Sequence, residues 1–228
     1  MTTQLLDRTI GSIACEIPGA TRVFHQYKLD FCCGGSKSLR EALERRKVED
    51  PKPVLDALST LSGMSQAEYR DWREVPVDTL IDHILHRYHD VHREQLPELT
   101  RLARRVEQVH GDRPTCPHGL ADHLADMQQE LESHMMKEEQ VLFPMLRRIS
   151  PVEVPAPVSM MRFEHDQHGE ALARLEALTN DITPPADACN TWRALYAGLH
   201  QLREDLMQHI HLENNILFME RKTQAEHV

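Results

Sequence analysis

Residues 134–143 read His-Met-Met-Lys-Glu-Glu-Gln-Val-Leu-Phe, and residues 209–218 read His-Ile-His-Leu-Glu-Asn-Asn-Ile-Leu-Phe. A second pattern precedes each copy: residues 89–96 read His-Asp-Val-His-Arg-Glu-Gln-Leu, and residues 165–172 read His-Asp-Gln-His-Gly-Glu-Ala-Leu. The copies are offset by 76 residues (165 − 89) and 75 residues (209 − 134), so this internal repeat keeps its register. All four segments lie in sequence with helical periodicity. A duplicated helix pair of this kind predicts an all-α, antiparallel four-helix bundle.

The longer pattern places a histidine four residues before a glutamate in both copies, as His134 and Glu138 and as His209 and Glu213. Residues four apart lie about one turn apart on the same face of a helix, so both side chains can reach one point. A single pair of this kind is usually a surface salt bridge, but two copies in matching context favour metal binding. Imidazole and carboxylate suit iron, manganese or zinc. We therefore predict a two-metal site, with iron favoured and manganese second.

The repeat also selects the single histidines that complete the site. His89 and His165 occupy matching positions, and each is followed by an aspartate. His92 and His168 also match, and we expect them to support the ligands or to lie at the surface. Glu139 is set aside because its counterpart is an asparagine. Five histidines without a repeat partner are expected to be solvated rather than ligands: His110, His118, His123, His200 and His211. The predicted ligands are His89, His134, Glu138, His165, His209 and Glu213.

The composition indicates a soluble, cytoplasmic protein. The chain has 228 residues and a net charge of −10, which argues against general nucleic-acid binding. No run is apolar enough to span a membrane, and the N-terminus lacks the apolar core of a signal peptide. Five cysteines make an odd count without a disulfide pattern, so we expect reduced thiols.

The expected helices divide the chain into a small domain, a linker and a bundle. Four long helices are expected over residues 77–109, 117–149 and 158–178 and, after a break at residues 183–185, up to residue 220. Shorter helices are expected near residues 18–27, after a capping box at residues 38–41, and over residues 53–61. The predicted domains are a small helical domain at 1–61, a linker at 62–75 and the bundle at 76–222.

The small domain carries the stretch Leu-Asp-Phe-Cys-Cys-Gly-Gly at residues 29–35. Cys32 and Cys33 lie upstream of a predicted helix N-terminus, which favours a thiolate. Two interpretations remain open at this point. The pair forms redox-active or metal-binding thiols, or it is two small residues buried in a tight loop.

The chain resembles a known family in two parts. The two His-x-x-x-Glu copies with two single histidines resemble a hemerythrin-like bundle, and residues 30–35 resemble the N-terminal domain of the repair-of-iron-centres proteins. Residues 87–90, 92–99, 133–139 and 212–215 carry the closest likeness. The resemblance implies a cytoplasmic protein with two iron ions per chain that helps restore iron–sulfur clusters damaged by nitric oxide or oxidants. It also implies homodimers, and damaged or apo iron–sulfur proteins as partners.

The same resemblance assigns roles to the site residues. It makes His89, His134, Glu138, His165, His209 and Glu213 the ligands of an oxo- and carboxylate-bridged di-iron centre. Glu138 and Glu213 are then the bridging carboxylates, and Cys32 and Cys33 are candidate redox thiols. Nitric oxide or oxygen is the expected small ligand, and neither nucleic acid nor membrane is an expected partner.

The chain departs from oxygen-carrying hemerythrins at two positions. Those proteins have a histidine four residues after the third-helix ligand, where this chain has Gly169, and end their last motif with His-x-x-x-x-Asp rather than His209-x-x-x-Glu213. The more open site favours small-molecule chemistry or labile iron over oxygen carriage. Two alternatives to a repair factor remain: a di-iron oxidoreductase that reduces nitric oxide or peroxide, and a module that senses or binds oxygen or nitric oxide.

Overall fold

The computed structural model describes residues 2–62 and 70–220, and the regular structure of these residues is helical apart from an isolated bridge between Thr9 and Ser38. The all-α prediction is therefore confirmed. The expected linker at residues 62–75 includes residues 63–69, and the expected bundle ends at residue 222; residues 63–69 and 221–222 lie outside the described residues. Among the described helices, none is both long and apolar enough to cross a membrane.

The contacts within the chain divide it into two compact units. One unit comprises residues 82–145 and 159–206. The other comprises the described residues within 1–81, 146–158 and 207–228.

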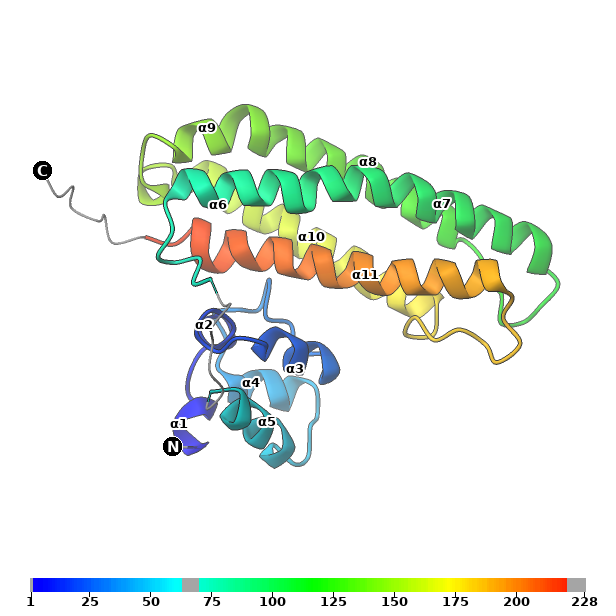
Figure 1. Ribbon diagram of the computed structural model, residues 1–228, viewed down its shortest axis with the longest axis horizontal. Coiled ribbons are helices and arrows are strands. Elements are labelled where there is room, and N and C mark those ends of the chain that lie inside the picture. The colour runs from blue at the N-terminus through cyan, green and yellow to red at the C-terminus, as the bar shows by residue number, and fades with distance from the viewer. Residues whose placement is uncertain (1, 63–69, 221–228) are drawn as a thin grey trace, which may run out of the picture. The chain divides into compact units, whose positions relative to one another are not determined.

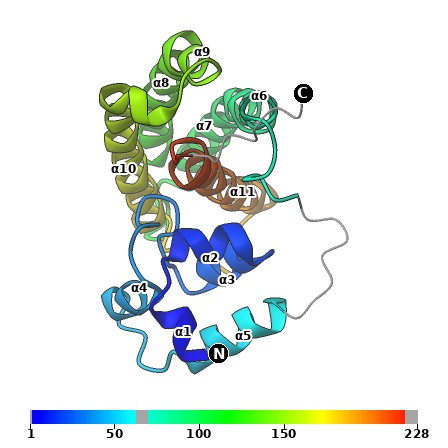
Figure 2. The ribbon, with the colours of Figure 1, turned by 90° about the vertical axis from the view of Figure 1, so that its left-hand side faces the viewer.

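The first unit is built from long helices that run side by side (Figures 1 and 2). The helices are α6 Val77–Ile84, whose last turn enters this unit, α7 Asp90–His110, α8 Leu120–Lys137, α10 Pro155–Leu178 and α11 Asn190–Leu212, together with the short α9 Phe143–Leu146. Arg203 of α11 forms an ion pair of 3.2 Å with Glu176 of α10. Gly198 permits close approach at another crossing, because a methyl group there would lie 2.5 Å from Leu99 Cδ2 of α7. Apolar side chains fill the space between the helices, with Trp192 fully buried.

Some helix boundaries differ from the sequence prediction for local reasons. Helix α8 begins at Leu120 rather than residue 117, because Gly119 precedes it in the left-handed conformation with φ +81°. Helix α10 begins earlier than expected, at Pro155, which suits the first turn of a helix because proline lacks an N–H group. Pro97 lies inside α7 without ending it.

Within the described part of the chain, three segments of π-helix interrupt or extend the long helices: η1 Leu85–His89, η2 Glu138–Leu142 and η4 Glu213–Leu217. In each, the residue after the segment donates its backbone N–H to the carbonyl five residues earlier, as Phe143 does to Glu138. A π-turn accommodates an extra residue and is common at functional sites. One end of each segment is a predicted metal ligand: His89 ends η1, Glu138 begins η2 and Glu213 begins η4.

The second unit contains five short helices and the end of the last long helix. The short helices are α1 Thr2–Leu6, α2 Ile10–Glu16, α3 Ala20–Gln26, α4 Leu39–Arg45 and α5 Lys52–Ser62, and a short 3-10 helix, η3, spans Pro151–Glu153. Their buried apolar side chains form one core around Phe24 and Phe31. The predicted capping box is present, with Ser38 accepting from the Glu41 backbone and Glu41 accepting from the Ser38 backbone. Met207 packs against this core.

Candidate metal centre

Glu138 has one histidine facing each of its carboxylate oxygens. His89 Nε2 lies 3.4 Å from Glu138 Oε2, and His134 Nε2 lies 3.4 Å from Glu138 Oε1. His165 Nε2 lies 3.1 Å from His134 Nε2. All four side chains are buried. Burial alone raises the pKa of Glu138, but the charges and hydrogen bonds of His134 and His89 outweigh it and lower the pKa well below its usual value.

The second copy of the motif has the same local geometry. His209 Nε2 lies 3.2 Å from Glu213 Oε1, one helical turn further along, and both side chains are buried. The helical spacing read from the sequence therefore places each histidine beside its glutamate, in both copies.

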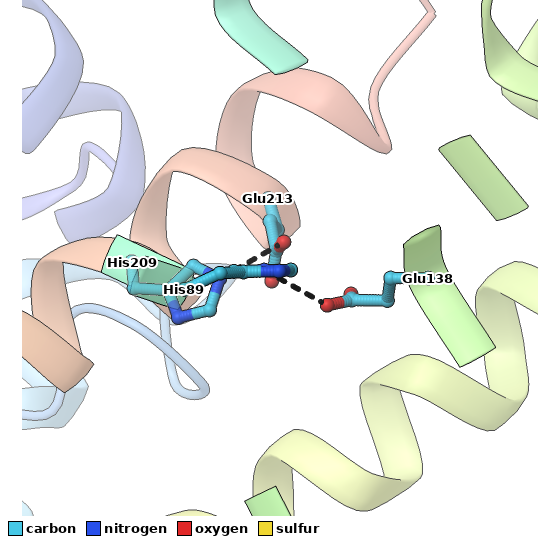
Figure 3. A group of neighbouring side chains, drawn as sticks. All are labelled: His89, Glu138, His209 and Glu213. Carbon is cyan, nitrogen blue, oxygen red and sulfur yellow. Dashed lines mark hydrogen bonds and ion pairs between the residues drawn. The ribbon is translucent and has the colours of Figure 1, made fainter. Parts of the chain in front are cut away.

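The six predicted ligands fall into two groups whose donor atoms lie within 4.8 Å of one another. The first group is His89, Glu138, His209 and Glu213 (Figure 3), and the second is His134, Glu138, His165 and Glu213. Both glutamates therefore belong to both groups. These are groups of buried histidine and carboxylate donors that can hold a metal ion.

The separations of the donor atoms fit metal coordination. Two bonds of about 2.1 Å that meet at about 90–110° place their donor atoms roughly 3.0–3.4 Å apart. The distances from Glu138 to His89 and His134, 3.4 Å each, lie at the upper end of this range. Both Glu138 oxygens are buried, and each faces a histidine nitrogen at 3.4 Å. Because burying a carboxylate is costly, a cation held by it and the histidines suits the site.

Two further carboxylates contact predicted ligand histidines at Nδ1, the ring nitrogen that is not directed at Glu138. Glu139 Oε1 lies 2.8 Å from His89 Nδ1 and also pairs with Arg93. Glu139, which was excluded from the predicted ligands, is thus placed to hold His89 in position. Such a partner fixes the tautomer and the ring orientation, leaving the other nitrogen for the metal.

Glu164 contacts His134 in the way that Glu139 contacts His89, and it was not among the residues predicted from the sequence. Its Oε2 lies 2.9 Å from His134 Nδ1, and Lys137 donates to its other oxygen. Burial raises the pKa of Glu164, but the hydrogen bonds from Lys137 and His134 outweigh it and lower that pKa. The repeat offered no signal, because the counterpart of Glu164 in the first copy is Tyr88.

The structure corrects the expected exposure of two histidines. His123 and His211 were expected to be solvated but are buried, at 5% and 2% exposure. His123 packs between helices, with Nε2 2.8 Å from the Ala171 carbonyl oxygen. His92 and His168 are buried too, so neither is a surface group, and the His168 ring lies 4.9 Å from that of His134.

The cysteine pair lies in a loop before α4 that contacts the end of the last long helix. Cys32 is buried and Cys33 is partly exposed. The hydrogen bond with Cys33, burial and the neighbouring charges raise the pKa of Cys32 well above its usual value. This shift is opposite to that expected of a thiol at a helix N-terminus. The local hydrogen bond and burial decide the direction, and α4 begins only at Leu39, seven residues after Cys32 (39 − 32), with Ser38 as its cap.

Two family models that match this chain identify the class of protein to which it belongs. Residues 80–220 match the family described as "Hemerythrin HHE cation binding domain", and residues 6–62 match the "Domain of Unknown function (DUF542)". Residues 80–220 therefore form a helical bundle of the hemerythrin type.

Relatives that match over nearly their whole length identify the particular family within this class. The chain is 47% identical over 215 residues to proteins named "Iron-sulfur cluster repair protein YtfE" from Yersinia pseudotuberculosis serotype O:1b and Yersinia pestis strain Pestoides F. The match covers 93% of this chain and 95% of each relative. The chain therefore belongs to the family of iron–sulfur cluster repair proteins.

Proposed function

We propose that this chain is a di-iron protein that repairs iron–sulfur clusters damaged by nitrosative and oxidative stress. The observation that carries the proposal is the sharing of Glu138 and Glu213 by two groups of buried donors. A carboxylate has two oxygens and can bridge two ions, whereas each imidazole offers a single nitrogen to one ion. The names of the relatives support the repair role, and the cation-binding family supports the metal.

Each ligand has a defined role in this proposal. His89 and His209 would hold one iron, His134 and His165 would hold the other, and Glu138 and Glu213 would be shared by both as bridging carboxylates. Bound iron supplies a redox-active centre with affinity for nitric oxide or oxygen. Six protein ligands are too few to saturate two six-coordinate ions, which leaves positions for a small ligand. Manganese is the second choice, because the same donors accept it.

The donor set also supports release of the iron to a client. Ferrous iron binds nitrogen and oxygen donors less tightly than ferric iron, so reduction of bound iron by an external electron donor would favour its release. Damaged or apo iron–sulfur proteins are the proposed partners, and association as a homodimer is part of the proposal. Cys32 and Cys33 are the candidate redox thiols for a step after metal binding.

A cluster-assembly experiment tests the repair role. The reduced, iron-loaded protein is mixed with an apo iron–sulfur protein and a sulfide source, with and without a ferrous chelator. We expect cluster assembly faster than with free ferrous iron and resistant to the chelator, and we expect His134→Ala to abolish the advantage. Assembly no faster than with free iron, together with rapid multiple turnover of nitric oxide, would show an oxidoreductase instead.

A further inference from the structure

Asp30, Cys32 and Cys33 form a second group of potential metal ligands, outside the bundle donors. One donor atom from each lies within 4.8 Å of the other two. The two sulfur atoms are 3.7 Å apart, and Cys32 Sγ lies 3.4 Å from Asp30 Oδ1. A vicinal disulfide is not formed in this structure, because that bond requires the sulfurs to be about 2.05 Å apart.

These separations agree with a tetrahedral thiolate site. Two metal–sulfur bonds of about 2.3 Å at the tetrahedral angle place the sulfurs about 3.8 Å apart. A metal–oxygen bond of about 2.1 Å beside a metal–sulfur bond gives a sulfur–oxygen separation of roughly 3.4–3.6 Å. The distances of 3.7 Å and 3.4 Å match both values.

Hydrogen bonds to its backbone groups hold in place the loop that carries these donors. The Cys33 backbone N–H donates to Asp30 Oδ1 at 3.0 Å. The Asn214 and Asn215 side chains donate to the Cys32 carbonyl oxygen, at 3.2 Å and 3.4 Å. The loop is tight, because a methyl group on Gly34 would lie 2.6 Å from the Asp30 carbonyl oxygen. Contacts of this kind preorganise the donors, which lowers the entropic cost of binding.

We propose that Asp30, Cys32 and Cys33 bind one thiophilic divalent cation, such as zinc or cobalt. Cys32 supplies a buried thiolate, while the partly exposed Cys33 and Asp30 admit the cation from solvent. The two thiol protons leave to solvent as the cation binds, because only thiolates are ligands. Three protein ligands leave a fourth position for water or a thiol from another molecule.

The three donors are not among the bundle donors, but their loop is hydrogen-bonded to the residue that follows one of those donors. Asn214, whose side chain holds the Cys32 carbonyl, directly follows Glu213. The loop that binds the thiophilic cation is therefore attached to the helical segment that begins with a bundle ligand. This inference does not require that the bundle hold iron or that the protein repair clusters.

Cobalt titration tests the proposal, because cobalt bound by thiolates has a sulfur-to-metal charge-transfer absorption that histidine and carboxylate donors cannot produce. The reduced, iron-loaded full chain is titrated anaerobically with Co²⁺, and difference spectra are recorded. We expect one cobalt per chain with this absorption, displaced by zinc. Absence of the absorption in the wild-type chain overturns the proposal, whatever the variants do.

Variants assign the absorption to the three residues. Cys32→Ser and Cys33→Ser should each abolish it, whereas Cys189→Ser, which removes an exposed thiol, should retain it. Asp30→Asn keeps an acceptor for the Cys33 N–H and removes the charge, so cobalt affinity should fall by about tenfold or more. An absorption that survives both serine substitutions assigns the thiolates elsewhere and refutes the site. Iron content, measured in every sample, reports separately on the bundle.

Discussion

Replacing Glu164 with alanine should weaken iron binding through His134, although Glu164 is not itself a ligand. The carboxylate lies 2.9 Å from His134 Nδ1, and its side chain is 15% exposed. A hydrogen bond to a charged group contributes about 1.5–3 kcal/mol, and this degree of burial requires little discount for solvent. Because about 1.4 kcal/mol corresponds to a factor of ten, the alanine variant should lose roughly ten- to a hundredfold in iron affinity.

Glu164→Gln should have a smaller effect. Glutamine keeps an acceptor for His134 Nδ1–H but removes the charge, and a charge-assisted hydrogen bond is about twice as strong as a neutral one. About half of the interaction then remains, and affinity should fall by roughly three- to tenfold. The order wild type, Gln, Ala is therefore part of the prediction.

Competition with a ferrous chelator measures the effect, both as an equilibrium and as a rate of iron release. Glu170→Ala is the matched control, because it removes one carboxylate from the same helix at an exposed position. It should release iron at nearly the wild-type rate. Equal iron loss in Glu164→Ala and Glu170→Ala would refute the reasoning, because the effect would then be general electrostatics rather than support of His134.

Three further predictions concern other parts of the chain. His89→Ala should lower iron content, measured by metal analysis, far more than His92→Ala, and the reverse order would show that the repeat selected the wrong histidine. The double variant Cys32→Ser, Cys33→Ser should keep the bundle iron but slow the recovery of iron–sulfur enzymes after nitric oxide exposure; full recovery would leave the pair a structural role only. Burial raises the pKa of Cys15 to about 12 from 9.0, so the folded thiol stays neutral while the unfolded one ionises above pH 9. The stability that Cys15 contributes is therefore present below pH 9 and lost between pH 9 and 12. The difference in free energy of unfolding between the wild type and Cys15→Ala, measured by urea unfolding, should shrink over that range. A difference that stays constant would contradict this.

The bundle and its donor residues were accessible from the sequence because both depend on local helix geometry. A separation of four residues places His134 beside Glu138 in any regular helix, and the distance in the structure is 3.4 Å. The repeat then distinguished His89 and His165 from the many other histidines without any knowledge of contacts. All six predicted ligands occur in the two donor groups, and their role as iron ligands stays a prediction.

Other features depended on contacts that no local pattern encodes. Glu164 supports His134 from another helix, 30 residues further along the chain, and the burial of His211 results from packing against Phe31 and Cys15. The three π-helical segments were also absent from the prediction, because apolar periodicity does not resolve a single extra residue in a turn.

The sequence alone thus determined which residue types recur at helical spacing, since that spacing is a property of one helix. Only the tertiary structure decided which charged groups meet, which histidines lose water and how far apart the two cysteine sulfurs lie. The physical reason is that hydrogen bonding, desolvation and donor separation depend on distances between residues remote in the chain, and these distances exist only after packing.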